Sequence, residues 1–451
     1  MRNKNTDVFE KYPVPKALAV LAFPMIIGQL IILAYNLADT FFIGRTNNPL
    51  MVAGISLILP VFNITISIAS LFGIGGGTLI SRLLGSGESE NAGKVSSFSF
   101  YAAIISAGLF ALFMYIFMDP VLIALGASND TLIYARQYTN CVIVIGAVPT
   151  ILTMTLANFL RSTGFAKQAG FGVATAGILN IFLDPLFMFV ILPPGNEAVG
   201  AGIATMLSNV CAFLYFMITI LKLGRTSSLS LSIFSCKPSL NYVKQIIFVG
   251  FPAALSVFLF DLTYMVIDKL TANYGDVALA AVGIVLKTER LPIAVGIGLC
   301  QGMMPLAAYN YSSGNHARMK EVVSYSRYIG IIVSMISVTL YELLAFYIMR
   351  IFIADPETVR LGTNFLRVRC VATPFMFLCF HPLNFFQAVG YGGKALYLGV
   401  LRFAVFNIPM LYIFEYLFGL YGIVWTQASA DIIVASISYY EYHKFKRALL
   451  Q

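Results

Sequence analysis

Long apolar segments separated by short polar ones dominate the pattern of the chain. A helix needs about 20 residues to cross a hydrocarbon core of about 30 Å, and each segment is long enough. The segments lack the roughly ten-residue alternation of barrel strands, so only helices satisfy their backbone amides in lipid. We therefore predict an all-α membrane protein with twelve transmembrane helices. The expected spans are 17–43, 51–80, 95–118, 132–159, 168–192, 198–221, 243–270, 277–309, 324–349, 362–389, 395–417 and 420–442.

The same pattern of residues returns after half the chain. Phe23-Pro24 recurs as Phe251-Pro252, and Asn180-Ile181 recurs as Asn407-Ile408. Other pairs at offsets of 225 to 229 are Gly75 with Gly302, Pro149 with Pro374, Asn158 with Asn384, and Gly164 with Gly390. A duplication of this kind defines the architecture. Because six spans per half is an even number, the halves are related by a pseudo-two-fold axis along the membrane normal.

The duplication divides the chain into three regions. We expect an N-terminal lobe over residues 1–221, a cytoplasmic linker over 222–242 and a C-terminal lobe over 243–451. Duplicated bundles that rock about a central cavity are typical of transporters. A scaffold without a transport role is the alternative.

Composition and charge support this class and set the orientation. Hydrophobic residues make up 59% of the chain and charged residues only 11%, against about 25% charged in a soluble domain. The predicted outer loops hold only four basic residues, Arg45, Lys269, Arg350 and Arg360. The predicted inner segments hold eighteen: Arg2, Lys4, Lys11, Lys16, Arg82, Lys94, Arg161, Lys167, Lys222, Arg225, Lys237, Lys244, Arg318, Lys320, Lys394, Lys444, Lys446 and Arg447.

This distribution explains the net charge of +9. By the positive-inside rule both termini are cytoplasmic, and the first span is an uncleaved anchor in the inner (cytoplasmic) membrane. No basic-aromatic groove remains for a nucleic acid, so we expect none as a partner.

Catalytic motifs are missing from the sequence. It contains no G-x-x-x-x-G-K-[ST], no H-E-x-x-H and no G-x-S-x-G, and it has only three histidines. The six cysteines form no Cys/His cluster, so we expect no metal-thiolate site and no cofactor. A membrane-embedded transferase would need a convergent acid-base site, and a passive channel would not move its cargo uphill. The glycine runs 73–77 and 298–302 indicate close helix packing.

Polar residues inside the predicted spans of the N-terminal lobe are the main functional candidates. Ionisable groups cost free energy in a membrane and are therefore candidates by default. Asp39 lies late in the first span, and Asn180 and Asp184 share one face of the fifth. Asn158 and Thr205 could complete an oxygen-rich pocket. Such a pocket suits either a proton or Na⁺, and Asp39, Asn180 and Asp184 would be the Na⁺ ligands. The alternative is that these side chains only join helices through hydrogen bonds.

The C-terminal lobe carries a different set of charges. Asp261, Asp268, Lys287, Glu289 and Arg290 form either a coupling or gating group or a structural ion-pair cluster. Four further ionisable residues should pair inside the same lobe: Arg367, Arg369, His381 and Arg402. Leu411 stands where the repeat would place a counterpart of Asp184, so the lobes are chemically unequal.

Several segments together resemble one known family. These are FPMIIGQ and ADTFFIG of the first span, GTLISRLLG after the second, and NFLRSTG and LNIFLDP around the fifth. In order, spacing and duplication they resemble the multidrug and toxic compound extrusion (MATE) family, over essentially the whole chain. The resemblance implies a V-shaped pair of six-helix bundles that exchanges amphipathic organic cations for H⁺ or Na⁺. We expect a monomer without an obligate protein partner.

The resemblance also implies roles for particular residues. Asp39, Asn158, Asn180, Asp184 and Thr205 match the family's ion site in the N-terminal lobe. Some branches use acids of the C-terminal lobe. Asp261 lies near one such position, but the predicted span 362–389 contains no acid to accompany it. A flippase for lipid-linked precursors, from the wider superfamily, would require more helices or a strongly basic cavity.

Overall fold

The protein is described here by a computed structural model that covers residues 6–449, and the membrane-length segments are helices throughout. The first half comprises α2 (Val14–Gly44), α3 (Pro49–Ser56), α4 (Leu59–Gly85), α5 (Ser89–Ala124), α6 (Asn129–Thr139), η2 (Asn140–Ile145), α7 (Ala147–Ser162), α8 (Ala166–Leu186), η3 (Phe187–Ile191) and α9 (Glu197–Leu223). The second half comprises α10 (Leu240–Ala272), α11 (Asp276–Ser312), α12 (His316–Phe352), α13 (Pro356–Cys370), α14 (Thr373–Ala388), α15 (Gly392–Val400), η6 (Leu401–Asn407), α16 (Ile408–Phe418) and α17 (Leu420–Ala448). Arg2 and Lys4, two of the basic residues used for orientation, lie outside the described residues.

Ten of the described helices are long and apolar enough to cross a membrane, and a broken helix adds an eleventh. That broken span joins α6 and η2 to α7 with a bend of 50° near Gly146. The remaining expected span, 362–389, which is the tenth along the chain, is two helices: α13 ends at Cys370, and α14 begins at Thr373. Since α13 is partly polar and carries Arg367 and Arg369 in its last turn, it does not have the composition of a lipid-exposed span.

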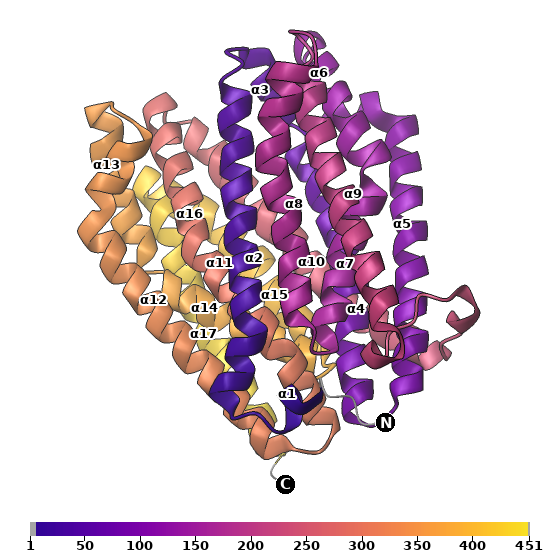
Figure 1. The fold of residues 1–451 in the computed structure, drawn as a ribbon. Coiled ribbons are helices and arrows are strands. Elements are labelled where there is room, and N and C mark those ends of the chain that lie inside the picture. Colours follow the sequence, from indigo (N-terminus) through magenta and orange to yellow (C-terminus); the bar gives the residue numbers. More distant parts are fainter. Residues whose placement is uncertain (1–5, 450–451) are drawn as a thin grey trace.

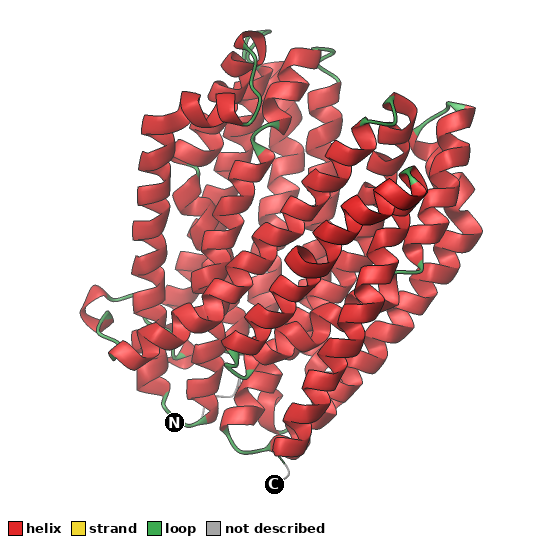
Figure 2. Ribbon diagram, turned by 180° about the vertical axis from the view of Figure 1, so that it is seen from behind, coloured by secondary structure: helices red, strands yellow, loops and turns green. Residues whose placement is uncertain are grey.

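The two halves form two helix bundles that stand side by side (Figures 1 and 2). The elements α2 to α9 make one bundle and α10 to α17 the other. A glycine with positive φ makes the corner before the fifth span of each half, at Gly164 (φ +90°) and Gly390 (φ +87°). Only glycine adopts this conformation without strain, so the duplicated corners have the same physical cause.

The bundles meet most closely toward the end of the molecule that carries α1 and the end of α17 (Figure 1). The contacts are between α4 and α10 and between α2 and α11. A side chain at Gly75 would overlap the carbonyl oxygen of Ile246, and one at Gly250 would overlap the carbonyl oxygen of Leu71. A Cβ at Gly298 would lie 2.6 Å from the Cα of Ile26. Gly302 is equally close to Ala22 of α2. Four glycines therefore form an inter-bundle seam, which we call the glycine seam: Gly75, Gly250, Gly298 and Gly302.

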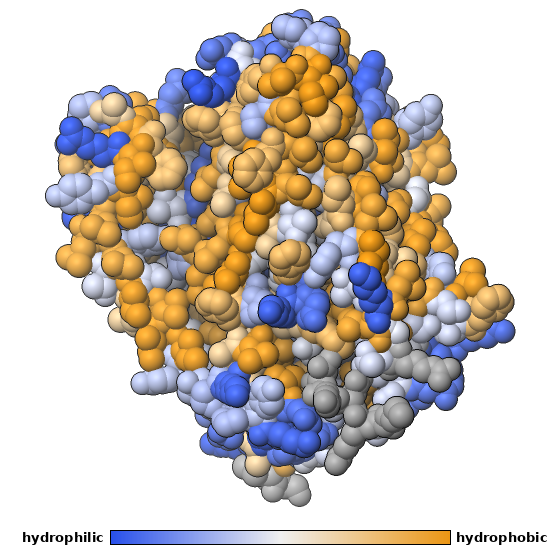
Figure 3. Space-filling model, in the orientation of Figure 1, coloured by the Kyte–Doolittle hydropathy of each residue, from blue (hydrophilic) through white to orange (hydrophobic). Residues whose placement is uncertain are grey.

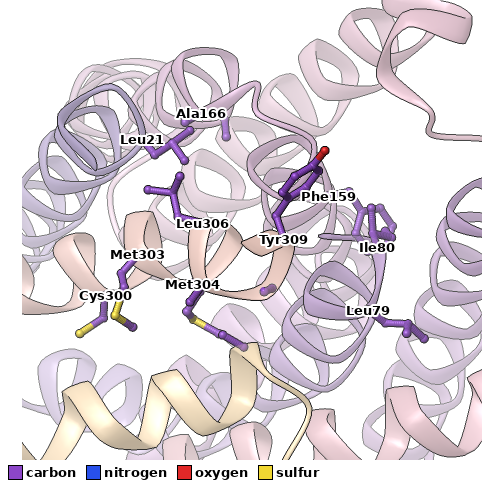
Figure 4. Packing of buried hydrophobic residues seen from close by; sticks show 14 of the residues in the cluster. Leu21, Leu79, Ile80, Phe159, Ala166, Cys300, Met303, Met304, Leu306 and Tyr309 are labelled. Carbon is purple, nitrogen blue, oxygen red and sulfur yellow. The ribbon is translucent and has the colours of Figure 1, made fainter. Parts of the chain in front are cut away.

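A buried hydrophobic cluster continues the seam across both bundles (Figure 4). Leu21 of α2 and Leu306 of α11 point toward each other in the close-up, near Ala166 of α8. Ile80 and Phe159, from α4 and α7, belong to the same cluster. The cluster closes this end of the molecule with apolar contacts between the bundles.

The short helix α1 (Asp7–Glu10) joins the first half of the chain to the second bundle. Phe9 is fully buried, and its ring stacks on Tyr309 of α11 with the centroids 4.9 Å apart. The carbonyl oxygen of Phe9 accepts hydrogen bonds from Asn310 Nδ2 (3.2 Å) and Arg318 Nε (2.7 Å). The Tyr309 hydroxyl donates to Glu10 Oε1 at 2.6 Å. We call residues 7–10 and these partners the N-terminal clasp.

The outer surface shows a broad band of apolar residues (Figure 3). Polar residues gather at both ends, as expected for a membrane-spanning body. Between α13 and α2 the surface is hollowed, and polar residues are visible inside the hollow (Figure 3). The bundles thus diverge at the end away from the glycine seam.

Candidate ion-binding site

The centre of the first bundle holds a cluster of oxygen atoms built on α8. Asn180 and Asp184 lie one turn apart on the same face, with exposed fractions of 2% and 0%. Asn180 Nδ2 donates to Asp184 Oδ1 and to Thr205 Oγ1 of α9, both at 3.2 Å. One amide therefore fixes the orientation of a carboxylate from its own helix and a hydroxyl from the next.

Asp39 of α2 lies beside this cluster. The helices α2 and α8 pack together, and a Cβ on Gly177 would meet the side chains of Ile31 and Tyr35. One to two turns beyond this contact, α2 presents Asp39 and α8 presents Asp184. The two carboxyl groups are close enough to interact electrostatically.

Three acceptor oxygens of this cluster have no hydrogen-bond partner within the described structure. They are Asp39 Oδ1, Asn180 Oδ1 and Asp184 Oδ2, and all three are buried. Two neighbouring buried carboxylates with no cationic side chain between them are costly unless a proton or a metal cation neutralises them. The donor set of carboxylate, amide and hydroxyl oxygens is the type that hard cations prefer. The residues therefore fit either H⁺ or Na⁺.

Two tyrosines border the cluster, and our sequence analysis did not name them. Tyr35 lies one turn before Asp39 on α2, a spacing that could have indicated it. Tyr138 of α6 interacts with the Thr205 hydroxyl and with both acids. No local pattern points to Tyr138, because only the tertiary fold brings α6 to this position.

Asn158, which we expected in the same pocket, lies elsewhere. Its Nδ2 donates to the carbonyl oxygen of Met154 (2.8 Å), and its Oδ1 accepts from Arg161 Nη2. Asn158 is four residues from the end of α7, whereas Asn180 is fourteen residues into α8. Because the Gly164 corner joins these helix ends, the rise per residue separates the two side chains by roughly 15 Å along the bundle.

The surroundings of Asn158 connect the two bundles instead. Arg161 Nη1 donates to Gln301 Oε1 of α11 at 2.6 Å, and Gln29 Nε2 of α2 approaches the same oxygen at 3.5 Å. Gln301 lies between Gly298 and Gly302 of the glycine seam. Asn158 therefore orients an arginine that crosses the inter-bundle contact.

The charged candidates of the second bundle come together around a buried ion pair. Glu289 accepts from Arg369 Nε at 2.7 Å and from Arg369 Nη2 at 2.8 Å, and the Tyr264 hydroxyl donates to it at 2.6 Å. Arg290 lies over the Tyr264 ring, 5.3 Å from its centroid. This geometry gives Glu289 a structural partner that our sequence analysis did not assign.

The remaining members of this group face outward from the ion pair. The side chains of Asp268, Lys287 and Arg290 are exposed, and Asp261 is partly buried. Arg290 interacts electrostatically with both Asp261 and Asp268. Exposed charges at membrane depth need water, so they belong on a wetted surface and not against lipid.

The repeat counterpart of the Asn180 cluster is filled differently. Asn407 Nδ2 donates to Gln427 Oε1 at 3.2 Å, which reproduces the Asn180–Thr205 bond, but Leu411 is a buried apolar residue. Nearby, Arg402 and Asp431 form a buried ion pair with an Nε–Oδ1 distance of 2.8 Å. Asn407 Oδ1, like Asn180 Oδ1, has no hydrogen-bond partner within the described structure. The bundles differ in their acids, since the second pairs Asp431 with a cation and the first leaves carboxylate oxygens unpaired.

Two like bundles of membrane-length helices, one of which holds a buried oxygen cluster, are the architecture of a membrane transporter built from a duplicated unit. The MatE family model matches the chain twice, over residues 24–186 and 252–413, once within each half. The chain belongs to the MATE family of multidrug efflux transporters.

Relatives agree with this assignment, and a solved structure shares the fold. The multidrug export protein MepA of Staphylococcus aureus (strain MSSA476) is 33% identical over 436 residues, which cover 96% of this chain and 95% of that protein. MepA of Staphylococcus haemolyticus (strain JCSC1435) is 31% identical over 449 residues, with 100% and 98% covered. A structure described as the outward-facing conformation of a multidrug resistance MATE family transporter has a TM-score of 0.93 at 23% identity, with 100% of this chain and 99% of that chain covered.

Proposed function

We propose that the chain exports amphipathic organic cations in exchange for H⁺ or Na⁺, as a monomer in the inner membrane with both termini in the cytoplasm. The ion binds at Asp39, Asn180, Asp184 and Thr205. The lobes 1–221 and 243–451 rock against each other and expose the site alternately to the two sides. Two observations support this substrate class: the relatives are named multidrug export proteins, and the aromatic content of 14% offers rings that attract cations.

The three unpartnered buried oxygens carry this proposal. Two of them belong to carboxyl groups without a cationic partner. In the described second bundle the counterpart of Asp184 is Leu411, the nearby acid Asp431 is neutralised by Arg402, and only the amide oxygen of Asn407 matches an unpartnered oxygen of the first cluster. Binding of a cation at the first bundle changes the free energy of one lobe arrangement relative to the other, which is the condition for coupling.

The conformation also supports the mechanism. The described contacts between the bundles concentrate in the glycine seam and the hydrophobic cluster, near α1 and the end of α17. With the termini in the cytoplasm, the closed end is cytoplasmic and the hollow faces outward. Ion uptake and drug release at the outer side would take place in this state.

The test is export of a fluorescent cation from vesicles under separately imposed Na⁺ and pH gradients. Asp39→Asn and Asp184→Asn should each reduce gradient-driven export by tenfold or more, because a carboxamide neither takes up a proton nor neutralises a bound cation. Asp119→Asn is the matched control: Asp119 forms an exposed ion pair with Arg136, so export should stay within twofold.

The gradient that drives wild-type export identifies the coupling ion. Uphill export by the double variant Asp39→Asn/Asp184→Asn at the wild-type rate would refute the site. Wild-type export that responds to neither gradient would refute ion exchange itself.

A further inference from the structure

The segment that links the two bundles is held on the outside of the first bundle. Residues 224–239 include η4 (Gly224–Ser227) and η5 (Ile233–Ser235). Ser96 and Ser97 of α5 donate to the carbonyl oxygen of Ser230 at 3.0 and 2.8 Å, and Ser230 N donates to Ser96 Oγ at 3.0 Å. The Tyr101 hydroxyl donates to the carbonyl oxygen of Leu231 at 3.0 Å. The linker is therefore a fixed structural element.

These bonds place the linker at the depth of the membrane surface. Ser96 is seven residues and Tyr101 twelve residues from the start of α5, so the linker lies roughly 10 to 18 Å along a membrane-spanning helix. Figure 1 shows the segment projecting sideways from the lower part of α5. On the same helix Ile105 and Leu109 are each 62% exposed, so this face of α5 contacts lipid.

The projecting tip is apolar and unusually exposed. Phe234 is 89% exposed, Ile233 is 62% exposed and Leu240, at the start of α10, is 70% exposed. At the right edge of Figure 3, apolar and hydrophilic residues lie side by side where the segment projects. An aromatic ring and aliphatic side chains beside lysines are typical of segments that rest in the headgroup region.

The charge of the segment has a single sign. Residues 222–246 contain Lys222, Arg225, Lys237 and Lys244 and no Asp or Glu. The side chains of Lys222, Lys237 and Lys244 are exposed. Basic residues next to a membrane span attract anionic headgroups, with about fivefold in affinity for each lysine at the surface.

Two acids at the start of α5 offset only a small part of this charge. Glu90 pairs with Lys94 at 2.8 Å. Hydrogen bonds from Asn91 and Tyr242 hold the pKa of Glu88 below its usual value, so this carboxylate stays ionised. Its single negative charge leaves the basic residues of the segment in clear excess.

We propose that the linker is a binding surface for anionic phospholipids, with Phe234 and Ile233 inserted between headgroups and Lys222, Lys237 and Lys244 bound to lipid phosphates. The lipids belong to the leaflet at the end of the molecule that carries α1. Because α5 holds residues 230–231 firmly, the surface anchors the first bundle, and only the stretch from residue 232 to α10 is left to follow the second bundle.

The test uses the single tryptophan of the full-length chain. Trp425→Phe with Phe234→Trp moves the only indole to the tip of the linker. The protein is reconstituted into phosphatidylcholine vesicles that contain a small fraction of brominated phosphatidylglycerol or of brominated phosphatidylcholine. We expect shallow bromines to quench strongly and the anionic lipid to quench at a severalfold lower fraction than the zwitterionic lipid.

Lysine variants separate the charge effect from simple proximity. Lys222→Gln/Lys237→Gln/Lys244→Gln should abolish the preference for the anionic lipid, whereas Lys167→Gln, at an exposed position on α8, should keep it. An emission spectrum typical of water, without quenching by either lipid, would overturn the proposal. Equal quenching by both lipids in the tryptophan variant that keeps the three lysines would overturn it as well. So would a preference for the anionic lipid that survives loss of the three lysines.

Discussion

The buried carboxylates of the two bundles differ in what surrounds them. In the second bundle Glu289 receives two hydrogen bonds from Arg369 and one from Tyr264. In the first bundle Asp39 and Asp184 have neighbours that donate hydrogen bonds or repel, but no cationic side chain is recorded beside them in the described structure. A buried acid that is paired with an arginine stays neutralised by it, whereas a buried acid without an arginine can bind and release a proton or a cation. This difference separates structural from functional acids.

Glu289→Gln should destabilise the protein through this ion pair. Removal of one partner leaves Arg369 buried and uncompensated, which costs about 3–5 kcal/mol. The measurement is the temperature at which the purified protein in detergent loses its folded monomer. The double variant Glu289→Leu/Arg369→Met should recover much of the loss, because it removes both charges. Normal thermal stability of Glu289→Gln together with lost export would instead indicate a role in transport.

Part of the site was predictable at the residue scale. The spacing of Asn180 and Asp184 places them on one helix face, and Asp39 falls at the corresponding depth in the first span. Asn158 was not predictable, because the sequence shows that it is polar and intramembrane but not that the Gly164 corner puts it at the other end of the bundle. The pairing of Arg402 with Asp431 joins residues from different helices, which no local pattern reveals.

At the scale of elements, the N-terminal clasp fastens α1 to α11 and α12. Phe9→Ala should loosen it, since truncation of a fully buried phenylalanine costs about 3–5 kcal/mol. The reporter is Leu21→Cys in a variant without the six native cysteines, because Leu21 is fully buried between the bundles. Maleimide labelling of this cysteine should become several times faster in Phe9→Ala.

Phe234→Ala is the matched control for this change. It removes a phenyl ring from an exposed position, so Leu21→Cys should be labelled as fast as in the protein that keeps both Phe9 and Phe234. Equal labelling rates in Phe9→Ala and Phe234→Ala would show that the N-terminal clasp does not help to close this end of the molecule.

Hydropathy predicted where the helices lie but not where they break. The apolar runs mark α2, α5 and α12 closely, because lipid requires continuous hydrogen bonding within each segment. The division of 362–389 into α13 and α14 escaped prediction, since a partly polar helix buried against its neighbours does not follow the rule for lipid contact. The bend at Gly146 likewise depends on packing between helices.

For the molecule as a whole, the glycine seam sets how closely the two bundles approach. Gly250→Val should force them apart at the closed end, because its side chain would overlap the carbonyl oxygen of Leu71. We expect faster labelling of Leu21→Cys and at least a tenfold loss of export. Gly283→Val is the control: a Cβ there meets nothing within 4 Å, so both measurements should stay near the wild-type values. Unchanged labelling in Gly250→Val would show that the seam does not hold the bundles together.

The two-bundle architecture was predictable because duplication leaves residue pairs at a constant offset. The closed end was not, since contacts such as Gly75 with Ile246 join residues from different halves and belong to only one arrangement of the bundles.

Only Lys11, Tyr12 and Pro13 separate the last residue of α1 from the first residue of α2. Four steps between Cα atoms span at most about 14 Å when fully extended. This length is an upper limit on how far the first residue of α2 can lie from the last residue of α1 while α1 stays folded with its phenyl ring on Tyr309. Any larger opening requires the ring to leave its site and to return before the next turnover, so its rate of rebinding would limit how fast the transporter can cycle.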